Sequence, residues 1–103
     1  MKLITKQLEE RFTQVGRQAE ESDPIIIAKF FNPNGAGTWY AISYEPEYNI
    51  CFGYVTGLAF DELGSFSIAE LESLSLPPLG LPIERDIHFK ECRLSDIKSG
   101  KVQ

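Results

Sequence analysis

The sequence predicts an α+β domain in which an antiparallel sheet of four to five strands carries an N-terminal helix on one face and a second short helix. Two runs rich in β-branched and aromatic residues, 24–31 and 38–45, flank a loop of Asn, Pro, Gly and Ala, as in a β-hairpin. The preceding segment, 5–19, has apolar residues at helical spacing. A chain of 103 residues is expected to form one domain over 1–103, with 99–103 as a flexible tail.

The N-terminal helix is predicted to begin after Thr5, because threonine is a favoured N-cap residue, and to continue to residue 19. Four apolar residues in this segment recur at spacings of four, three and four. They therefore lie on one side of the helix, which we expect to pack against the sheet. These residues are Leu8, Phe12, Val15 and Ala19.

The hairpin has a predicted register in which Phe31 lies opposite Thr38. One face then holds the pairs Phe30–Trp39, Ala28–Ala41 and Ile26–Ser43, and this face is the expected core. The other face holds Lys29–Tyr40, Ile27–Ile42 and Ile25–Tyr44. Two alternatives stay open for that second face: residues 68–98 cover it, or it forms a docking surface or homodimer contact centred on Tyr40 and Tyr44.

The second half of the chain is predicted to add three strands, at 50–60, 64–66 and 83–90, a short helix at 67–74 and a last helical turn at 94–98. A capping box of Ser67 and Glu70 begins the short helix. Arg85 falls in the apolar phase of its strand, so we expect it to pair with Glu70 or Glu72. The alternative is that Arg85 offers its guanidinium to a partner.

The charge balance is acidic, with 15 Asp and Glu against 10 Lys and Arg and a net charge of −5. Direct nucleic-acid binding usually needs a basic stripe, which is missing, so the composition argues against it. A nucleic-acid-directed accessory protein or a weak DNA mimic stays open as an alternative. The sequence shows no signal peptide and no apolar run of about 20 residues, so we expect a cytoplasmic protein without a membrane span.

The residues that usually carry chemistry do not assemble into a recognisable site. Cys51 and Cys92 are too few for a disulfide framework and are expected to be free thiols. His88 is the single histidine, and three alternating residues on one strand spread too widely to hold a metal ion. We therefore predict no catalytic residue, no cofactor and no metal, with a small enzyme of unrecognised site as an alternative.

Several segments carry a family resemblance: Lys29-Phe-Phe, Thr38-Trp-Tyr-Ala, Phe52-Gly, 62–72 and 79–86. With them the chain resembles an uncharacterised family, a domain of unknown function, of small acidic bacterial proteins common on plasmids and conjugative elements. The resemblance implies a bacterial mobile-element setting and assigns no catalytic residue.

The function that these observations favour is a non-enzymatic protein-interaction module that binds a protein partner or a second copy of itself. The candidate partner-binding residues are Lys29, Tyr40, Tyr44 and Arg85.

Overall fold

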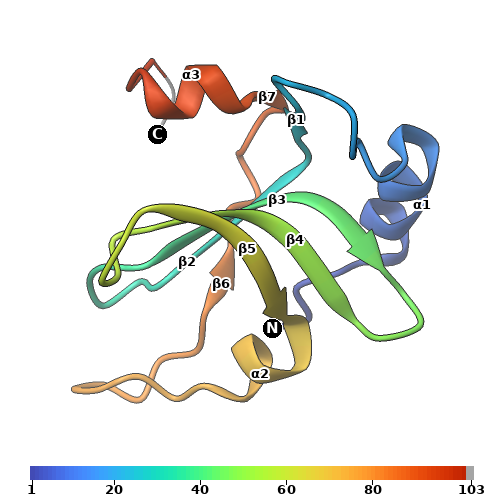
Figure 1. The fold of residues 1–103 in the computed structure, drawn as a ribbon. Helices are drawn as coiled ribbons and strands as arrows, with labels where there is room; N and C mark the ends of the chain where they lie inside the picture. The colour runs from blue at the N-terminus through green and yellow to red at the C-terminus, as the bar shows by residue number, and fades with distance from the viewer. Residues whose placement is uncertain (102–103) are drawn as a thin grey trace.

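The computed structural model describes residues 1–101 and confirms the α+β fold class (Figure 1). Five strands form one antiparallel sheet in the order β5-β4-β3-β2-β6, and β1 pairs separately with β7. The helices are α1 Lys6–Val15, α2 Ile68–Ser73 and α3 Leu94–Lys98. The strands are β1 Ile25–Ile26, β2 Ala28–Phe31, β3 Thr38–Glu45, β4 Ile50–Thr56, β5 Glu62–Ser67, β6 Glu84–Arg85 and β7 Cys92–Arg93.

Helix α1 begins where predicted and ends earlier. The Thr5 hydroxyl accepts a hydrogen bond from the Leu8 N–H at 3.1 Å, so the predicted N-cap is confirmed. At the other end Gly16 adopts a φ of +82°, which glycine tolerates, and its N–H donates to the Phe12 carbonyl. The prediction of a helix to residue 19 is therefore wrong, and Ala19 lies exposed in the following loop. Phe12 is buried as expected.

The hairpin register is confirmed for four pairs: Ala28–Ala41, Lys29–Tyr40, Phe30–Trp39 and Phe31–Thr38. Beyond them the ladder breaks, because β3 bulges between Ala41 and Ser43 against β4, and the Ile27 N–H donates to the Ala41 carbonyl at 2.8 Å. A bulge adds one residue to a strand and so reverses the side-chain alternation after it. The predicted pairs Ile26–Ser43, Ile27–Ile42 and Ile25–Tyr44 are therefore wrong.

The sheet has a hydrophobic core on each side. We call the side packed against α1 and α2 the inner face, and the opposite side the outer face. The inner core is the larger, and its most deeply buried large side chains are Phe30, Leu3, Ile68 and Ile83. The outer core consists of Ile26, Tyr40, Ile42, Leu94 and Ile97, with Tyr54, Phe89 and Cys92 packed against it.

The outer core is closed by α3, which a two-stranded pairing holds in place. β1 and β7 pair through Ile25–Arg93 and Ile26–Cys92 immediately before α3 begins. The Asp23 carboxylate accepts hydrogen bonds from the Ser95 N–H at 2.8 Å and from the Ser95 hydroxyl at 2.6 Å. The bond from the Ser95 hydroxyl is the main reason that the pKa of Asp23 is lowered. Asp23 thus caps α3 from a distant part of the chain.

The strand predicted at 83–90 is wrong beyond its first residues. β6 contains only Glu84 and Arg85, which pair with Phe31 and Phe30 of β2. The chain then turns, because the Asp86 carboxylate accepts the His88 N–H at 2.9 Å in an Asx turn. The segment that follows leaves the sheet edge and leads to β7 and α3 over the outer face (Figure 1).

The central strands differ from the prediction in their lengths. β4 ends at Thr56 instead of residue 60, and β5 covers six residues where three were predicted. Gly53 lies so close to the Tyr40 carbonyl that a β-carbon would collide with it, which explains a glycine within β4. The Ser67 hydroxyl accepts from the Glu70 N–H at 3.2 Å as predicted, but α2 ends at Ser73, which leaves Leu74 37% exposed instead of facing the core.

The C-terminal residues extend the packed layer of α3. The Ser99 and Gly100 amides donate to the carbonyls of Ser95 and Ile97. Residues 102 and 103 of the predicted tail lie outside the described residues. None of the helices within 1–101 has the length and apolar composition that crossing a bilayer requires.

Candidate functional site

Tyr40 lies in the outer core and is 6% exposed. Its ring is 6.4 Å from that of Phe89 and 6.5 Å from that of Tyr54, measured between centroids. Burial raises the pKa of its hydroxyl. Of the two predicted alternatives for this face, covering by the chain's own C-terminal part is confirmed. The alternative of a docking surface centred on Tyr40 and Tyr44 is wrong, because the segment after Asp86 crosses the face that would have to be open.

Tyr44 lies on the opposite side of the sheet from Tyr40. The bulge between Ala41 and Ser43 turns its side chain to the inner face, where its ring is 5.8 Å from that of Phe12. The Tyr44 hydroxyl donates to the Asn49 side-chain oxygen at 2.7 Å. The two tyrosines therefore cannot form one contact surface.

Lys29 and Arg85 are both engaged within the chain. The Lys29 Nζ lies 3.7 Å from an Asp86 carboxylate oxygen, and its side chain is 16% exposed. Arg85 donates from Nη1 to the main-chain carbonyls of Lys2 at 2.8 Å and Leu3 at 3.2 Å. The predicted ion pair of Arg85 with Glu70 or Glu72 is wrong, because the N-terminal segment runs there.

Glu72 holds the same N-terminal segment from the other side. The Glu72 carboxylate accepts a hydrogen bond from the Leu3 N–H at 2.8 Å, while the Leu3 carbonyl accepts one from Arg85. Leu3 itself is fully buried in the inner core. Arg85 and Glu72 thus both fix the entry of the chain into the core, which is a structural role.

The two thiols lie on opposite sides of the sheet. Cys51 is buried in the inner core, and burial raises its pKa to about 12, while Cys92 packs against the outer core. His88 is exposed in the turn after β6. Within residues 1–101, no group of three His, Cys, Asp or Glu side chains is placed to hold a metal ion. These residues show no arrangement for thiol or metal chemistry.

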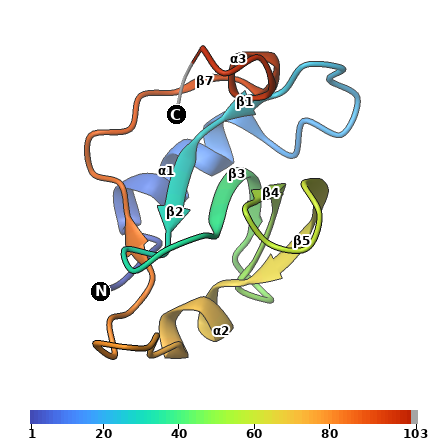
Figure 2. The same cartoon turned by 90° about the vertical axis from the view of Figure 1, so that its left-hand side faces the viewer.

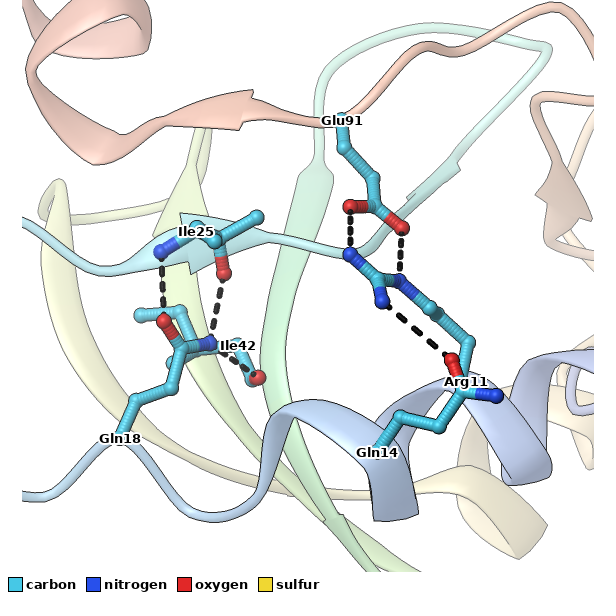
Figure 3. Close-up of polar contacts among 6 residues, drawn as sticks. All are labelled: Arg11, Gln14, Gln18, Ile25, Ile42 and Glu91. Atoms are coloured by element: carbon cyan, nitrogen blue, oxygen red, sulfur yellow. Dashed lines mark hydrogen bonds and ion pairs between the residues drawn. The ribbon is translucent and has the colours of Figure 1, made fainter.

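A polar cleft of about 710 Å³ lies between α1 and residues 85–91. Arg11 spans it and binds Glu91 in a bidentate ion pair, with N–O distances of 2.7 and 2.8 Å (Figure 3). The remaining Nη1 of Arg11 donates to the Gln14 side chain at 3.3 Å. The hydrogen bond from Arg11 to Glu91 and their opposite charges raise the pKa of the guanidinium. Arg11 and Glu91, the charged groups that span the cleft, are thus bound to each other.

A second groove, of about 490 Å³, crosses the outer face from β5 over β4 and β3 to the loop that follows α1. Its floor includes Ile50, Phe52, Leu63 and Leu94. Phe52 is 41% exposed and Leu63 is 47% exposed, although they lie diagonally next to each other on paired strands. Side chains of this size so exposed and adjacent leave an apolar surface uncovered.

Strand β5 forms one edge of the groove and also one edge of the sheet. Figure 2 shows it at the margin of the sheet, and within residues 1–101 no strand pairs with its outer side. Its six residues pair with β4 without a bulge. Natural proteins usually protect such an edge with Lys, Pro, a bulge or a covering element, and β5 contains neither Lys nor Pro. The opposite edge, β6, is only two residues long.

The charges of the molecule are divided unevenly along the chain. Between Lys29 and Arg85 the sequence has no Lys, Arg or His. The same stretch contains seven acidic residues: Glu45, Glu47, Asp61, Glu62, Glu70, Glu72 and Glu84. This stretch includes β3, β4, β5 and α2, so the free edge belongs to the acidic part of the chain. The groove is lined by this part and by the loop after α1, where Arg17 pairs with Glu45 at 3.2 Å.

These features were missed in the sequence analysis for different reasons. Phe52 appeared as an ordinary strand residue, and Leu63 lay outside the predicted strand 64–66 although it belongs to β5. The exposure of both side chains depends on where α3 stops covering the outer face. The free edge depends on strand order, which local patterns do not encode. The stretch without basic residues, by contrast, is plain in the sequence and would have drawn attention to this half of the chain.

The fold and the surface thus define an α+β domain with an apolar groove on the outer face of its sheet. Residues 3–98 match the family described as Protein of unknown function (DUF2958), and the chain belongs to this family. Comparison with curated proteins and with solved structures gave no match.

Proposed function

We propose that this chain is a non-enzymatic protein-interaction module and that it binds its partner through the apolar groove on the outer face. The observation that carries this proposal is the pair Phe52 and Leu63, which are 41% and 47% exposed at the floor of a groove of about 490 Å³. Covering about 100 Å² of such surface contributes about 2.5 kcal/mol, so a partner that fills the groove gains substantially. Apolar side chains at the centre of a contact, surrounded by polar groups, are typical of protein interfaces.

The alternative of a small enzyme has less support. The polar cleft between α1 and residues 85–91 contains ionised groups, but Arg11 and Glu91 bind each other. Cys51 has a thiol pKa of about 12 and lies in the core, so it is not a usable nucleophile. An enzyme needs groups whose pKa is matched to proton transfer and that face a substrate.

The alternative of a weak DNA mimic also has less support. Glu45 and Glu62 lie at opposite ends of β4, which has seven residues and therefore spans about 20 Å. Duplex DNA carries one charge per about 1.7 Å of its axis. The carboxylates of the acidic half are too widely spaced to reproduce that density.

The setting that we propose is the cytoplasm of a bacterium that carries a mobile element. The two free cysteines agree with a reducing compartment. The mobile-element setting rests on the family resemblance of the segments described above.

The test compares capture of partners by the wild-type chain and by a Leu63→Lys variant in a lysate of the native host. Leu79→Lys is the matched control, because Leu79 is 73% exposed in the loop after α2 and does not line the groove. We expect one protein to bind the wild type and the control and to be lost with Leu63→Lys. The purified partner should then bind Leu63→Lys at least tenfold more weakly. Equal binding by both variants would overturn the proposal.

A further inference from the structure

We infer that the partner contributes an extended, basic segment that adds to β5 as a sixth strand of the sheet. This inference rests on the proposed function and names the chemistry of its partner. It follows from three observations: an unprotected sheet edge, its position beside the apolar groove and the charge around it.

The edge of β5 is open to strand addition. An edge strand presents unpaired N–H and C=O groups, which an extended peptide can satisfy. In the strand order β5-β4-β3-β2-β6, and within residues 1–101, β5 is paired on one side alone, so the main-chain groups of its other side have no strand partner. β5 pairs with β4 over six residues without a bulge, so its outer side offers an unbroken row of alternating N–H and C=O groups.

The groove supplies a second set of contacts for the same segment. Side chains on an added strand alternate between the two faces of the sheet. Those that point to the outer face would lie beside Leu63 and Ser65, which line the groove. A segment of about six residues spans about 20 Å and would therefore cover the length of β5. Apolar residues at alternate positions fit this surface.

The charge around β5 selects a basic occupant. Asp61 and Glu62 lie at one end of the strand, and Glu70 follows its other end in α2. A second copy of the chain would place its own β5 and the same carboxylates against them, so like charges would oppose self-pairing. Lys or Arg near the ends of a foreign segment would instead meet opposite charges.

The experiment uses the full chain, labelled with ¹⁵N, and two capped heptapeptides as probes. The basic probe is Lys-Val-Thr-Val-Thr-Val-Lys, and the acidic probe has Glu in place of both lysines. We expect the basic probe to shift the amide signals of Glu62–Ser67, to slow their hydrogen exchange and to bind at least tenfold more tightly than the acidic probe.

A charge-reversed chain provides the second arm. In Glu62→Lys/Glu70→Lys the preference should change to the acidic probe, whereas Glu9→Lys/Glu10→Lys on exposed positions of α1 should keep the wild-type preference. Thermal melting checks that each variant is folded. If the double variant at β5 does not fold, the comparison of the two probes on the wild-type chain still decides the question.

Four results would overturn the inference. The first is no binding of the basic probe, and the second is a set of shifts spread over acidic residues of α1 instead of β5. The third is equal affinity for both probes. The fourth is a concentration-dependent shift of β5 signals without any peptide, because that would identify a second copy as the occupant.

Failure of the inference can be told apart from failure of the proposed function. A host partner could depend on Leu63 and still leave the hydrogen exchange of the Glu62–Ser67 amides unchanged in its complex with the wild-type chain. The groove would then bind a partner without strand addition. If no host partner depends on Leu63, the proposed function itself fails, whatever the peptides do.

Discussion

Removal of the Gln18 side chain is expected to open the junction between β1 and β3. The Gln18 Nε2 donates to the carbonyls of Ile25 at 2.8 Å and Ile42 at 3.0 Å, and its Oε1 accepts the Ile25 N–H at 2.7 Å (Figure 3). These main-chain groups lie where the bulge separates the two strands. The side-chain amide thus replaces the strand pairing that the bulge removes.

The magnitude follows from the three hydrogen bonds. Each contributes about 0.5–1.5 kcal/mol net, so Gln18→Gly should lower the free energy of unfolding by about 2–4 kcal/mol. Glycine is the right replacement because Gln18 has a φ of +57°, which alanine would find strained. Glycine also raises the entropy of the unfolded chain, and this cost of about 0.4–1 kcal/mol is roughly offset by relief at the positive φ. The melting temperature should fall by on the order of 10 °C.

The assay is urea unfolding followed by fluorescence of Trp39, the single tryptophan, which is 8% exposed. Glu20→Gly, at an exposed position of the same loop, is the matched control. In Gln18→Glu a carboxylate would face two carbonyls at neutral pH, so we expect a comparable loss that is partly recovered when acid protonates the group. Identical midpoints for Gln18→Gly and Glu20→Gly would refute the reasoning.

Three further predictions concern the core, the thiols and acid stability. Phe12→Ala should lower the free energy of unfolding by about 3–5 kcal/mol, because Phe12 is only 3% exposed. An unchanged urea midpoint would contradict this. In thiol titration of the native chain Cys92 should react before Cys51, whose pKa is about 12, and simultaneous reaction would contradict the burial. Because folding lowers the pKa of Asp23, its stabilising bonds are present above the unfolded pKa of about 3.9 and are lost as pH falls through the lower folded value. The protection factor of the Ser95 amide, which is the exchange rate corrected for the intrinsic effect of pH, should therefore fall in the wild type as pH drops through the folded pKa and show no such step in Asp23→Ala.

Local signals in the sequence were sufficient for the features that depend on neighbouring residues. The N-cap at Thr5, the cap at Ser67 and the hairpin register from Ala28 to Phe31 are all confirmed. In each case the determining contacts lie within one turn or one hairpin. The fold class followed from the same signals, because a hairpin with an amphipathic helix before it has few ways to bury its apolar side chains.

The bulge in β3 was not predictable from its own sequence. The residues Ala41-Ile-Ser-Tyr44 alternate smoothly and contain no glycine that would mark a bulge. The extra residue lets Ile42 be buried in the outer core while Tyr44, two residues later, packs partly buried against the inner core. For this reason the prediction that Tyr40 and Tyr44 share one surface was wrong.

The prediction of a strand at 83–90 was wrong for a different reason. Its alternation of apolar residues imitates a strand, but the Asp86 side chain binds the main chain ahead of it and begins a turn. Arg85 donates to the main-chain carbonyls of Lys2 and Leu3. Every residue has such a carbonyl, so the sequence does not indicate which ones Arg85 will bind. The predicted partner residues were thus those that the fold engages within the chain.

The division of charge along the chain also affects how this protein meets other molecules before any contact forms. Between Lys29 and Arg85 there are seven acidic residues and no basic ones, whereas the rest of the chain has ten basic and eight acidic residues. This division gives the domain an electric dipole. In the field of a charged partner such a dipole turns the molecule, so that encounters begin with the acidic end forward. Association rates with a basic partner should then fall with rising ionic strength, because the Debye length shrinks from about 30 Å at 0.01 M to about 8 Å at 0.15 M. Electrostatic steering would in this way contribute much of the selectivity for a partner before contact, over distances comparable to the 40 Å length of the domain.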